Sequence, residues 1–137
     1  ERKWWRHVMD SVTDIPSQIP MQTFSFEEWR KYLHPPFLNR KLAVVALEDR
    51  SIVGLLFLGD VYGIRANTSH SSVKRSHRRR GIALALKYAI KNIAQKQGIQ
   101  FLMTQNHQHN PMFEINKKVG FQVLDTQIEV QKKIKST

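Results

Sequence analysis

The residues of this chain best suited to chemistry form a basic turn that ends in a glycine. Lysine and arginine crowd residues 74–80, and Gly81, Ile82 and Ala83 follow at once. A short strand-like run precedes the turn, and a long amphipathic helix pattern follows it. The first N–H groups of a helix lack intrahelical partners, and the helix dipole adds positive charge at the same end. The junction therefore predicts a site for a phosphate or a diphosphate.

The same cluster of cations could also serve another function or none. A basic run is typical of a nucleic-acid patch or a nuclear-import signal, and it is most often only a solvated face. Neither a patch nor an import signal needs Gly81-Ile82-Ala83 or a helix that begins directly after it. The spacing therefore favours phosphate binding through the backbone, with Arg78 and Arg80 mostly exposed.

The helix and strand patterns that position this turn indicate a mixed α/β chain. Apolar spacing predicts helices at residues 2–10, 26–33, 82–97 and 111–119. Ser25 and Glu28 form a capping box for the second helix. Asn110 caps the fourth, and Pro111 stands at its first position. One apolar stripe of the long helix consists of Ile82, Leu86, Ala89, Ile90, Ile93 and Ala94.

Strands are predicted between these helices. Residues 42–47 and 52–58 form a hairpin of mostly buried strands around a polar turn, and Gly54 suggests a bulge or a close backbone approach. Further strands are expected at 68–73, 99–104 and 121–133. Proline-broken loops are expected at 14–20 and 34–36, and a loop or a frayed strand at 59–67. The second half then holds a parallel strand–helix–strand unit.

Composition limits the function. A chain of 137 residues with 41% hydrophobic residues predicts one domain over residues 1–137. The absence of cysteine excludes disulfides, a thiol nucleophile and sulfur-ligated zinc. A net charge of +11 attracts polyanions. No apolar run reaches the roughly 20 residues that a membrane span needs, so we expect no membrane contact and a cytoplasmic location.

Two motifs carry a family resemblance. The run 73–83 fits the acyl-CoA-binding signature Q/R-x-x-G-x-G/A of the GCN5-related N-acetyltransferases (GNAT), with Arg78, Gly81 and Ala83 in the defining places. Residues 104–121 resemble the second motif of the branch that carries T-x-N-x-x-x-N-x-x-M-x-x-I-N-x-x-x-G-F. The joint spacing is more specific than either motif alone. The resemblance implies the GNAT fold, with a mixed central sheet splayed at the cofactor site and helices on both faces.

The resemblance also implies acetyl-CoA as the cofactor and gives its contacts. The diphosphate would lie on the N–H groups of residues 79–84, where Gly81 and Ala83 let it approach. The arm would lie in the splay beyond Val73. The implied cofactor-binding residues are Ser72, Val73, Lys74, Arg78, Arg79, Arg80, Gly81, Ile82, Ala83, Leu84, Asn106, Asn110, Met112, Phe113, Asn116 and Lys117.

The chain departs from the family pattern in two places. Many relatives carry a tyrosine four residues before the G-F pair, as the acid that protonates the leaving thiolate. Asn116 stands there in this chain and is predicted to contact the thiol or the arm instead, which leaves the acid unassigned. The family's first strand is also missing before the first helix, so truncation, a tandem partner or a strand from another chain stays open.

Candidate catalytic and acceptor residues follow from the strand at 68–73 and the early helices. His70 is the candidate general base, with a surface or structural histidine as the alternative. Ser71, Trp29 and Tyr32 are candidate acceptor contacts. The histidines near the predicted cleft lack the spacing of a metal site, so no metal is expected.

The function implied is transfer of an acetyl group from acetyl-CoA directly to a primary amine on a small molecule or peptide. A module that binds acyl-CoA without turnover, as a sensor or scaffold, is the first alternative. A basic nucleic-acid-binding domain is the second. The identity of the acceptor and the oligomeric state, homodimer or tandem, stay open.

Overall fold

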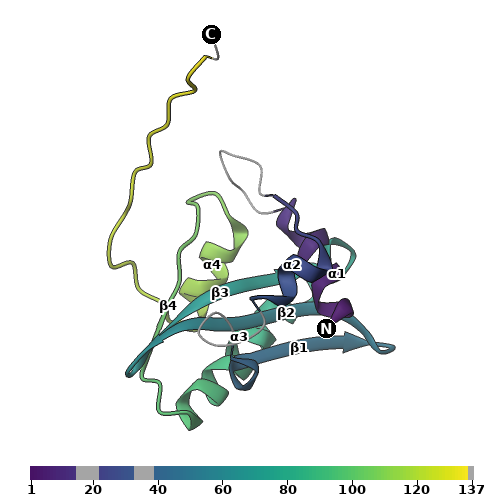
Figure 1. Ribbon diagram of the computed structural model, residues 1–137. Helices are drawn as coiled ribbons and strands as arrows, with labels where there is room; N and C mark the ends of the chain where they lie inside the picture. The colour runs from purple at the N-terminus through teal and green to yellow at the C-terminus, as the bar shows by residue number, and fades with distance from the viewer. Residues whose placement is uncertain (15–21, 33–38, 136–137) are drawn as a thin grey trace.

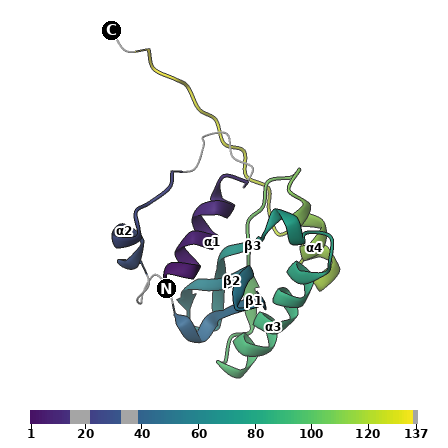
Figure 2. The same ribbon diagram turned by 90° about the vertical axis from the view of Figure 1, so that its right-hand side faces the viewer.

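A central sheet lies between two layers of helices (Figures 1 and 2). The computed structural model describes residues 1–14, 22–32 and 39–135. The sheet has the order β1-β2-β3-β4, and β2 (Ser51–Tyr62) is antiparallel both to β1 (Ala43–Glu48) and to β3 (Arg65–Val73). β4 (Phe101–Met103) is parallel to β3, and α3 (Ile82–Lys96) connects them. The predicted mixed sheet and parallel strand–helix–strand unit are confirmed.

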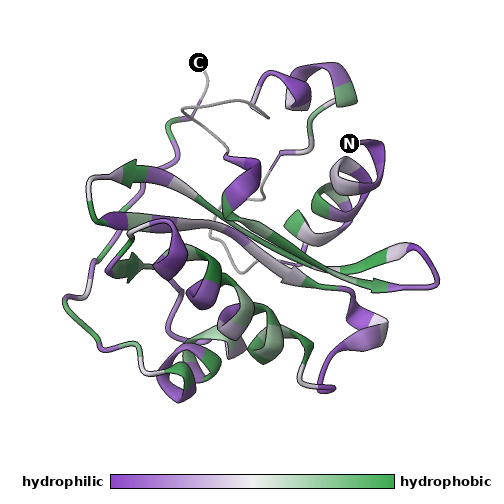
Figure 3. Cartoon of the chain, turned by 90° about the horizontal axis from the view of Figure 1, so that it is seen from below, coloured by the Kyte–Doolittle hydropathy of each residue, from purple (hydrophilic) through white to green (hydrophobic). Residues whose placement is uncertain are grey.

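The helices bury two separate apolar clusters. α1 (Arg2–Val12) and α2 (Phe26–Arg30) cover one face, where Val8, Val12 and Trp29 pack on Leu55. α3 covers the other face, together with α4 (Pro111–Val119), and Leu86 and Ile90 pack there on Leu56 and Leu58. Figure 3 shows this sandwich with the sheet between the helix layers. The predicted helices on both faces are confirmed.

The strands alternate their side chains between these two layers. The predicted hairpin is present, and Asp49 and Arg50 form its turn with left-handed backbone. Residues 59–67 were predicted as a loop or a frayed strand, and they are strand: they extend β2 and β3 around a turn at Gly63. Gly54 is a point of close approach: an added Cβ would lie 3.0 Å from the side chains of Ile82 and Leu86. α3 therefore sits directly on β2.

β4 pairs with only the first part of β3. Its partners are Arg65, Ala66 and Asn67, so residues 68–73 of β3 continue past the end of β4. The pairing of β3 with β2 skips Ser69, which marks a bulge at the start of that stretch. A bulge turns a strand away from its neighbour. Beyond Asn67, β3 therefore has no strand partner on its β4 side among the described residues, which is where the resemblance places the splay of the sheet.

The long helix begins and ends where predicted, but its buried face differs by one position. Gly98 follows it with a left-handed φ of +80°, as expected of a helix-ending glycine. Ala89, which was placed in the apolar stripe, is exposed. Lys87 is buried instead, with 2% of its surface exposed. The prediction for Ala89 is wrong because α4 packs on the side of α3 that carries Lys87, and a sequence pattern cannot place that second helix.

The C-terminal segment is the clearest error of the sequence prediction. Residues 121–133 were predicted as a terminal strand, but residues 121–135 form no strand and extend away from the body (Figures 1 and 2). Val130 is 91% exposed. A strand needs a neighbour for its N–H and C=O groups, and alternating side chains alone do not supply one.

The remaining boundaries differ by a few residues. α2 ends at Arg30, earlier than predicted, and residue 33 and the 34–36 stop lie outside the described residues, as do residues 15–20 of the predicted loop. A short 3-10 turn, η1 (Arg40–Leu42), takes the first residue expected in β1. In the described part of the chain, no helix is both long and apolar enough to cross a bilayer.

Candidate active site

The turn before α3 has the backbone that a phosphate site requires. Gly81 has a φ of +78° and Arg79 a φ of +60°, so the chain turns sharply twice within three residues. The N–H of Ala85 donates to the Gly81 carbonyl at 3.0 Å. The N–H groups of residues 82–84 therefore precede the first intrahelical bond, and no side chain caps the helix. A Cβ on Gly81 would meet no heavy atom within 4 Å, so the glycine faces open space.

Two carboxylates order the cations around this turn. Asp14, just past α1, accepts from Arg75 and from Arg78 (3.0 Å), and the hydrogen bond from Arg75 lowers the pKa of Asp14. Glu48, at the end of β1, pairs with His77 at 2.9 Å and Arg80 at 3.6 Å.

The cations that remain are available to a ligand. In the described part of the chain, Lys74 and Arg79 have no ion pair, although both belong to the predicted cofactor site. Arg78 also donates through Nε to the Val73 carbonyl at 3.2 Å, which ties the turn to the end of β3. The pairings leave the backbone of residues 79–84 as the main contact for an anion.

The α4 side of the site is held by asparagine side chains. Asn110 accepts from the N–H of Met112 at 3.0 Å and so caps α4 as predicted. Asn116 is 3% exposed and donates through Nδ2 to Asn106 Oδ1 at 2.5 Å. Met112 and Phe113 are half-buried. These residues lie in the loop after β4 and on α4, and their contact with a cofactor stays a prediction.

Lys117 lies on the outer side of α4. Its Nζ is 2.7 Å from Glu114 Oε1 and 4.6 Å from the centre of the Phe113 ring. To contact the nucleotide phosphates, Lys117 would have to break its ion pair with Glu114. That role stays a prediction.

A buried cluster of two histidines and two serines, the histidine cluster, links β3 to α1. Ser72 Oγ lies 2.7 Å from His70 Nε2 and 2.8 Å from His7 Nε2. Ser11 Oγ donates to the Val8 carbonyl at 2.8 Å and lies 3.3 Å from His70 Nε2. The four clustered residues are at most 9% exposed.

The donors of the histidine cluster fix both tautomers. Ser11 gives its only proton to Val8, so it can only accept from His70, and His70 therefore carries a proton on Nε2. That N–H also reaches Ser72, whose own proton is then free to go to His7 Nε2. His7 would then carry its proton on Nδ1, which makes no hydrogen bond among the described residues; burial lowers the pKa of His7, and backbone contacts to Ser72 and Ile52 oppose that shift. His70 keeps an unprotonated Nδ1.

The environment of His70 makes it a weak base. Burial first, and then the charge of His7, lower the pKa of His70 to about 4. Its ring stacks on Phe57 with centroids 5.5 Å apart. The ring is neutral at pH 7 and can accept a proton, but the best general bases have a pKa near the working pH. The structure therefore gives His70 a structural role in the cluster, and its catalytic role stays a prediction.

The predicted acceptor contacts are scattered. Trp29 is 7% exposed and packs edge-on against Trp4 with centroids 6.5 Å apart, so most of its ring belongs to the core. Tyr32 is 48% exposed. Ser71 points to the opposite face from His70 and Ser72, and its buried hydroxyl has no partner among the described residues.

Sequence reasoning missed three polar residues that the fold buries. His7 and Ser11 lie on α1 at i and i+4, which places them on one helix face; that spacing was a signal for a shared buried partner. Lys87 gave no such signal, because a single lysine in an amphipathic helix is normally exposed to solvent.

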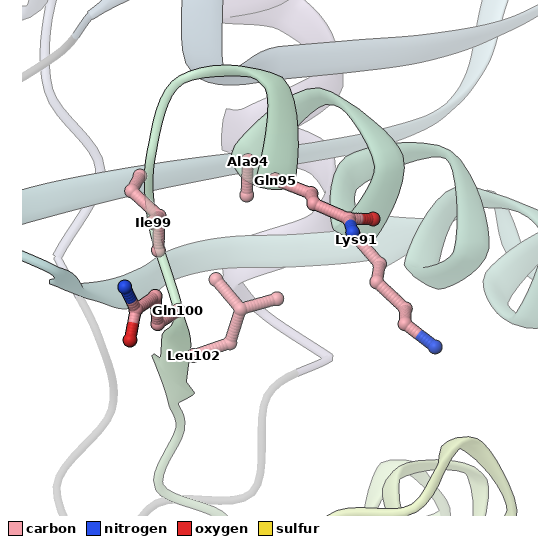
Figure 4. A pocket seen from close by; sticks show the side chains of 6 residues that line it. All are labelled: Lys91, Ala94, Gln95, Ile99, Gln100 and Leu102. Atoms are coloured by element: carbon pink, nitrogen blue, oxygen red, sulfur yellow. The ribbon is translucent and has the colours of Figure 1, made fainter.

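A separate hollow lies at the far end of α3 (Figure 4). Its volume is about 340 Å³, and it is lined by Lys91, Ala94, Gln95, Ile99, Gln100 and Leu102. None of these is a predicted site residue. The hollow lies beside β4 at the opposite end of the helix from Gly81, so we do not assign the cofactor to it.

Comparisons with known proteins bear on the family and the fold of the chain. A model of the acetyltransferase (GNAT) family matches residues 5–121. A search of curated proteins finds no match. The fold is similar to AAC(6')-Iy in complex with a CoA bisubstrate analogue, at 15% identity over 97% of this chain and 91% of that chain, with a TM-score of 0.69.

Two further solved structures are similar. One is the aminoglycoside acetyltransferase meta-AAC0020 from an uncultured soil metagenomic sample, at 16% identity, 98% and 90% coverage, and a TM-score of 0.72. The other is a GCN5-related N-acetyltransferase from Sphaerobacter thermophilus, at 22% identity and a TM-score of 0.70, which covers 88% of this chain but 37% of that chain. These likenesses establish the fold, and the family model over residues 5–121 establishes that the chain belongs to the acetyltransferase (GNAT) family.

Proposed function

We propose that this N-acetyltransferase passes the acetyl group of acetyl-CoA directly to a primary amine. The observation that carries the proposal is the turn at Gly81, where the first N–H groups of α3 have no capping side chain and a Cβ would point into open space. A diphosphate is the ligand that such a helix start holds best. Lys74 and Arg79, which have no ion pair within the described ranges, add positive charge beside it.

The rest of the site suits the remainder of the cofactor. Residues 68–73 of β3 extend past β4, so their outward N–H and C=O groups can bond the amides of an extended arm. An N–H near Val73 would polarise the thioester carbonyl, as an oxyanion hole does. Acetyl-CoA supplies the activated acyl group, and His70 or a water takes the proton of the amine.

Two glycines at opposite ends of α3 allow a specific test of phosphate binding at the Gly81 turn. Gly81 and Gly98 stand at opposite ends of α3, with φ values of +78° and +80° and no neighbour within 4 Å of an added Cβ. Alanine at either position has a similar backbone strain, about 1 to 2 kcal/mol, because φ is left-handed at both. By isothermal titration, we expect Gly81→Ala to weaken acetyl-CoA binding at least tenfold and Gly98→Ala to leave it unchanged. Equal affinity of the two variants for acetyl-CoA would show that the Gly81 turn is not part of the binding site.

Thiol release over a panel of amines tests turnover. The similar structures named above include aminoglycoside acetyltransferases, so an aminoglycoside belongs in the panel, with a polyamine, lysine and a peptide N-terminus. The excess of positive charge favours an acidic or phosphorylated acceptor over a polycation. Release with at least one amine supports the enzyme. Tight acetyl-CoA binding with no release supports a sensor, and DNA or RNA binding without acetyl-CoA binding supports a nucleic-acid domain.

A further inference from the structure

The C-terminal segment, residues 121–135, carries apolar side chains that the rest of the chain leaves uncovered. Ile128 is 87% exposed and Val130 91%. In the described part of the chain, the last backbone hydrogen bond from this segment to the body runs from the Phe121 N–H to the Asn116 carbonyl at 3.0 Å. The segment then extends away from the body (Figures 1 and 2). Monomeric proteins rarely expose such a row of large aliphatic side chains, so the row indicates a binding partner.

Within the segment, residues 124–131 have the pattern of a strand with one apolar side. The even positions hold Leu124, Thr126, Ile128 and Val130, and the odd positions hold Asp125, Gln127, Glu129 and Gln131. Side chains alternate between the two sides of a strand, so one side would be apolar and the other polar. β-Branched residues also favour strands. A strand forms, however, only where a neighbouring strand pairs with its N–H and C=O groups.

β4 offers an unpaired edge to such a strand. It ends the order β1-β2-β3-β4 and, among the described residues, pairs only with β3. The Phe101 N–H donates to the Ile64 carbonyl at 3.0 Å, on the β3 side. Backbone groups alternate sides along a strand, so the N–H and C=O of Leu102 point away from β3. An open edge of this kind is a template for a further strand.

The hollow of Figure 4 lies beside this edge, on the α3 face of the sheet. Its apolar lining comes from Ala94, Ile99 and Leu102, and its volume is about 340 Å³. Leu102 packs on the apolar cluster under α3. A strand added beyond β4 would turn one of its two sides toward the same face. The apolar side of residues 124–131 is therefore the side that can fill the hollow.

The charges near β4 are complementary to those of the C-terminal segment. Arg65 lies beside Phe101 in the register of β3 and β4, and Lys91 lines the hollow. Both cations are exposed, and neither has an ion pair among the described residues. The same holds for Asp125 and Glu129 on the polar side of the segment. Pairing of the segment with β4 therefore brings opposite charges together.

We propose that the C-terminal segment binds the β4 edge of a second copy of this chain, with Leu124, Ile128 and Val130 over the hollow. The second copy supplies the neighbouring strand that a single chain lacks. A second copy is favoured over the segment's own β4 because the segment leads away from its own body, and its roughly 15 residues at about 3.3 Å each can reach across a neighbouring molecule. Each chain has a segment to give and an edge to receive one, so the exchange is reciprocal and closes as a two-fold dimer. The Gly81 turn lies at the other end of α3, so this dimer does not depend on the proposed function.

The first experiment compares the two sides of the segment. Ile128→Ser with Val130→Ser removes two aliphatic side chains from the apolar side, and Gln127→Ser with Gln131→Ser, on the polar side, is the matched control. None of the four residues belongs to an apolar cluster of the fold, so both variants should fold. By sedimentation equilibrium, we expect the wild-type protein and the control to be dimers with similar dissociation constants, and the apolar-side variant to have a dissociation constant at least about a hundredfold higher. A wild-type protein that stays monomeric, or equal dissociation constants for the two variants, would overturn the proposal.

The second experiment identifies which chain each segment contacts. The sequence has no cysteine, so introduced thiols react without background. Chains with Gln127→Cys are mixed with chains with Gln100→Cys, a position that lines the hollow beside β4, and are treated with a short bis-maleimide linker. We expect a covalent dimer of one chain of each kind, and no such dimer when Glu27→Cys on α2, at the opposite face of the sheet, replaces Gln100→Cys. A chain with both Gln127→Cys and Gln100→Cys that links only to itself would place the segment on its own β4 and overturn the proposal.

Discussion

The two faces of β3 differ in how far their buried polar groups are satisfied. On the α1 face, the histidine cluster pairs the Nε2 atoms of His7 and His70 with the hydroxyls of Ser11 and Ser72, and His7 Nδ1 is without a hydrogen bond. On the α3 face, Lys87 Nζ and Asn116 Oδ1 are buried without hydrogen-bond partners among the described residues. A satisfied network fixes a structure, and an unsatisfied one costs stability until something completes it. The histidine cluster therefore anchors α1 to β3, whereas the unpaired atoms on the α3 face cost stability.

The largest expected effect comes from removing the centre of the histidine cluster. Ser72→Ala deletes the hydroxyl that both rings share, so His7 Nε2 loses its partner and His70 Nε2 keeps only the longer contact with Ser11 at 3.3 Å. An orphaned buried group costs about 1 to 3 kcal/mol, and with the weakened second contact we expect a loss of about 3 kcal/mol in the free energy of unfolding. Urea denaturation measures it. A loss below about 1 kcal/mol would mean that the cluster does not anchor α1.

Acid sensitivity gives the second prediction. The pKa of His70 is about 4 in the folded protein against 6.5 as its ordinary value, so only the unfolded chain binds the proton between these pH values. Stability is then fully present above pH 6.5 and falls by about 3 kcal/mol as pH drops to 4. His7 adds in the same direction, because burial also lowers its pKa. Urea denaturation at several pH values measures the slope.

A histidine elsewhere in the chain provides the control for that slope. His70→Gln should flatten the pH dependence in this range, while His107→Gln, in the exposed loop before α4, should leave it intact. An equal slope in the wild-type protein and His70→Gln would contradict the buried neutral ring.

The sequence could foresee backbone sites better than side-chain sites. The turn at Gly81 was predictable, since a glycine, a cation run and a helix start are local signals. The cap at Asn110 was local too. Lys87 was not, because its burial depends on α4, which packs on α3 from more than twenty residues away. The predicted strand at 121–133 failed for the same reason: its alternation is local, but a pairing partner is not.

The third prediction has the opposite sign. Lys87→Met keeps the aliphatic stem and removes an uncompensated charge, so we expect the free energy of unfolding to rise by about 2 kcal/mol at pH 7. Because burial lowers the pKa of Lys87 from 10.5 to about 8, its cost is complete below pH 8 and fades toward pH 10.5. The advantage of the variant should fade over the same range. Destabilisation would place Lys87 in a satisfied network.

The smallest effect is expected one residue from the largest. Ser71 and Ser72 are adjacent on β3, but their side chains point to opposite faces, and the Ser71 hydroxyl is buried without a partner. Ser71→Ala removes only an orphaned group, so the free energy of unfolding should change by less than about 0.5 kcal/mol, or rise slightly. If the hydroxyl instead binds the acceptor, as predicted from sequence, KM for the amine rises while stability stays the same. A loss of stability as large as that of Ser72→Ala would show that polar groups on the two faces of β3 do not differ in how well they are hydrogen-bonded.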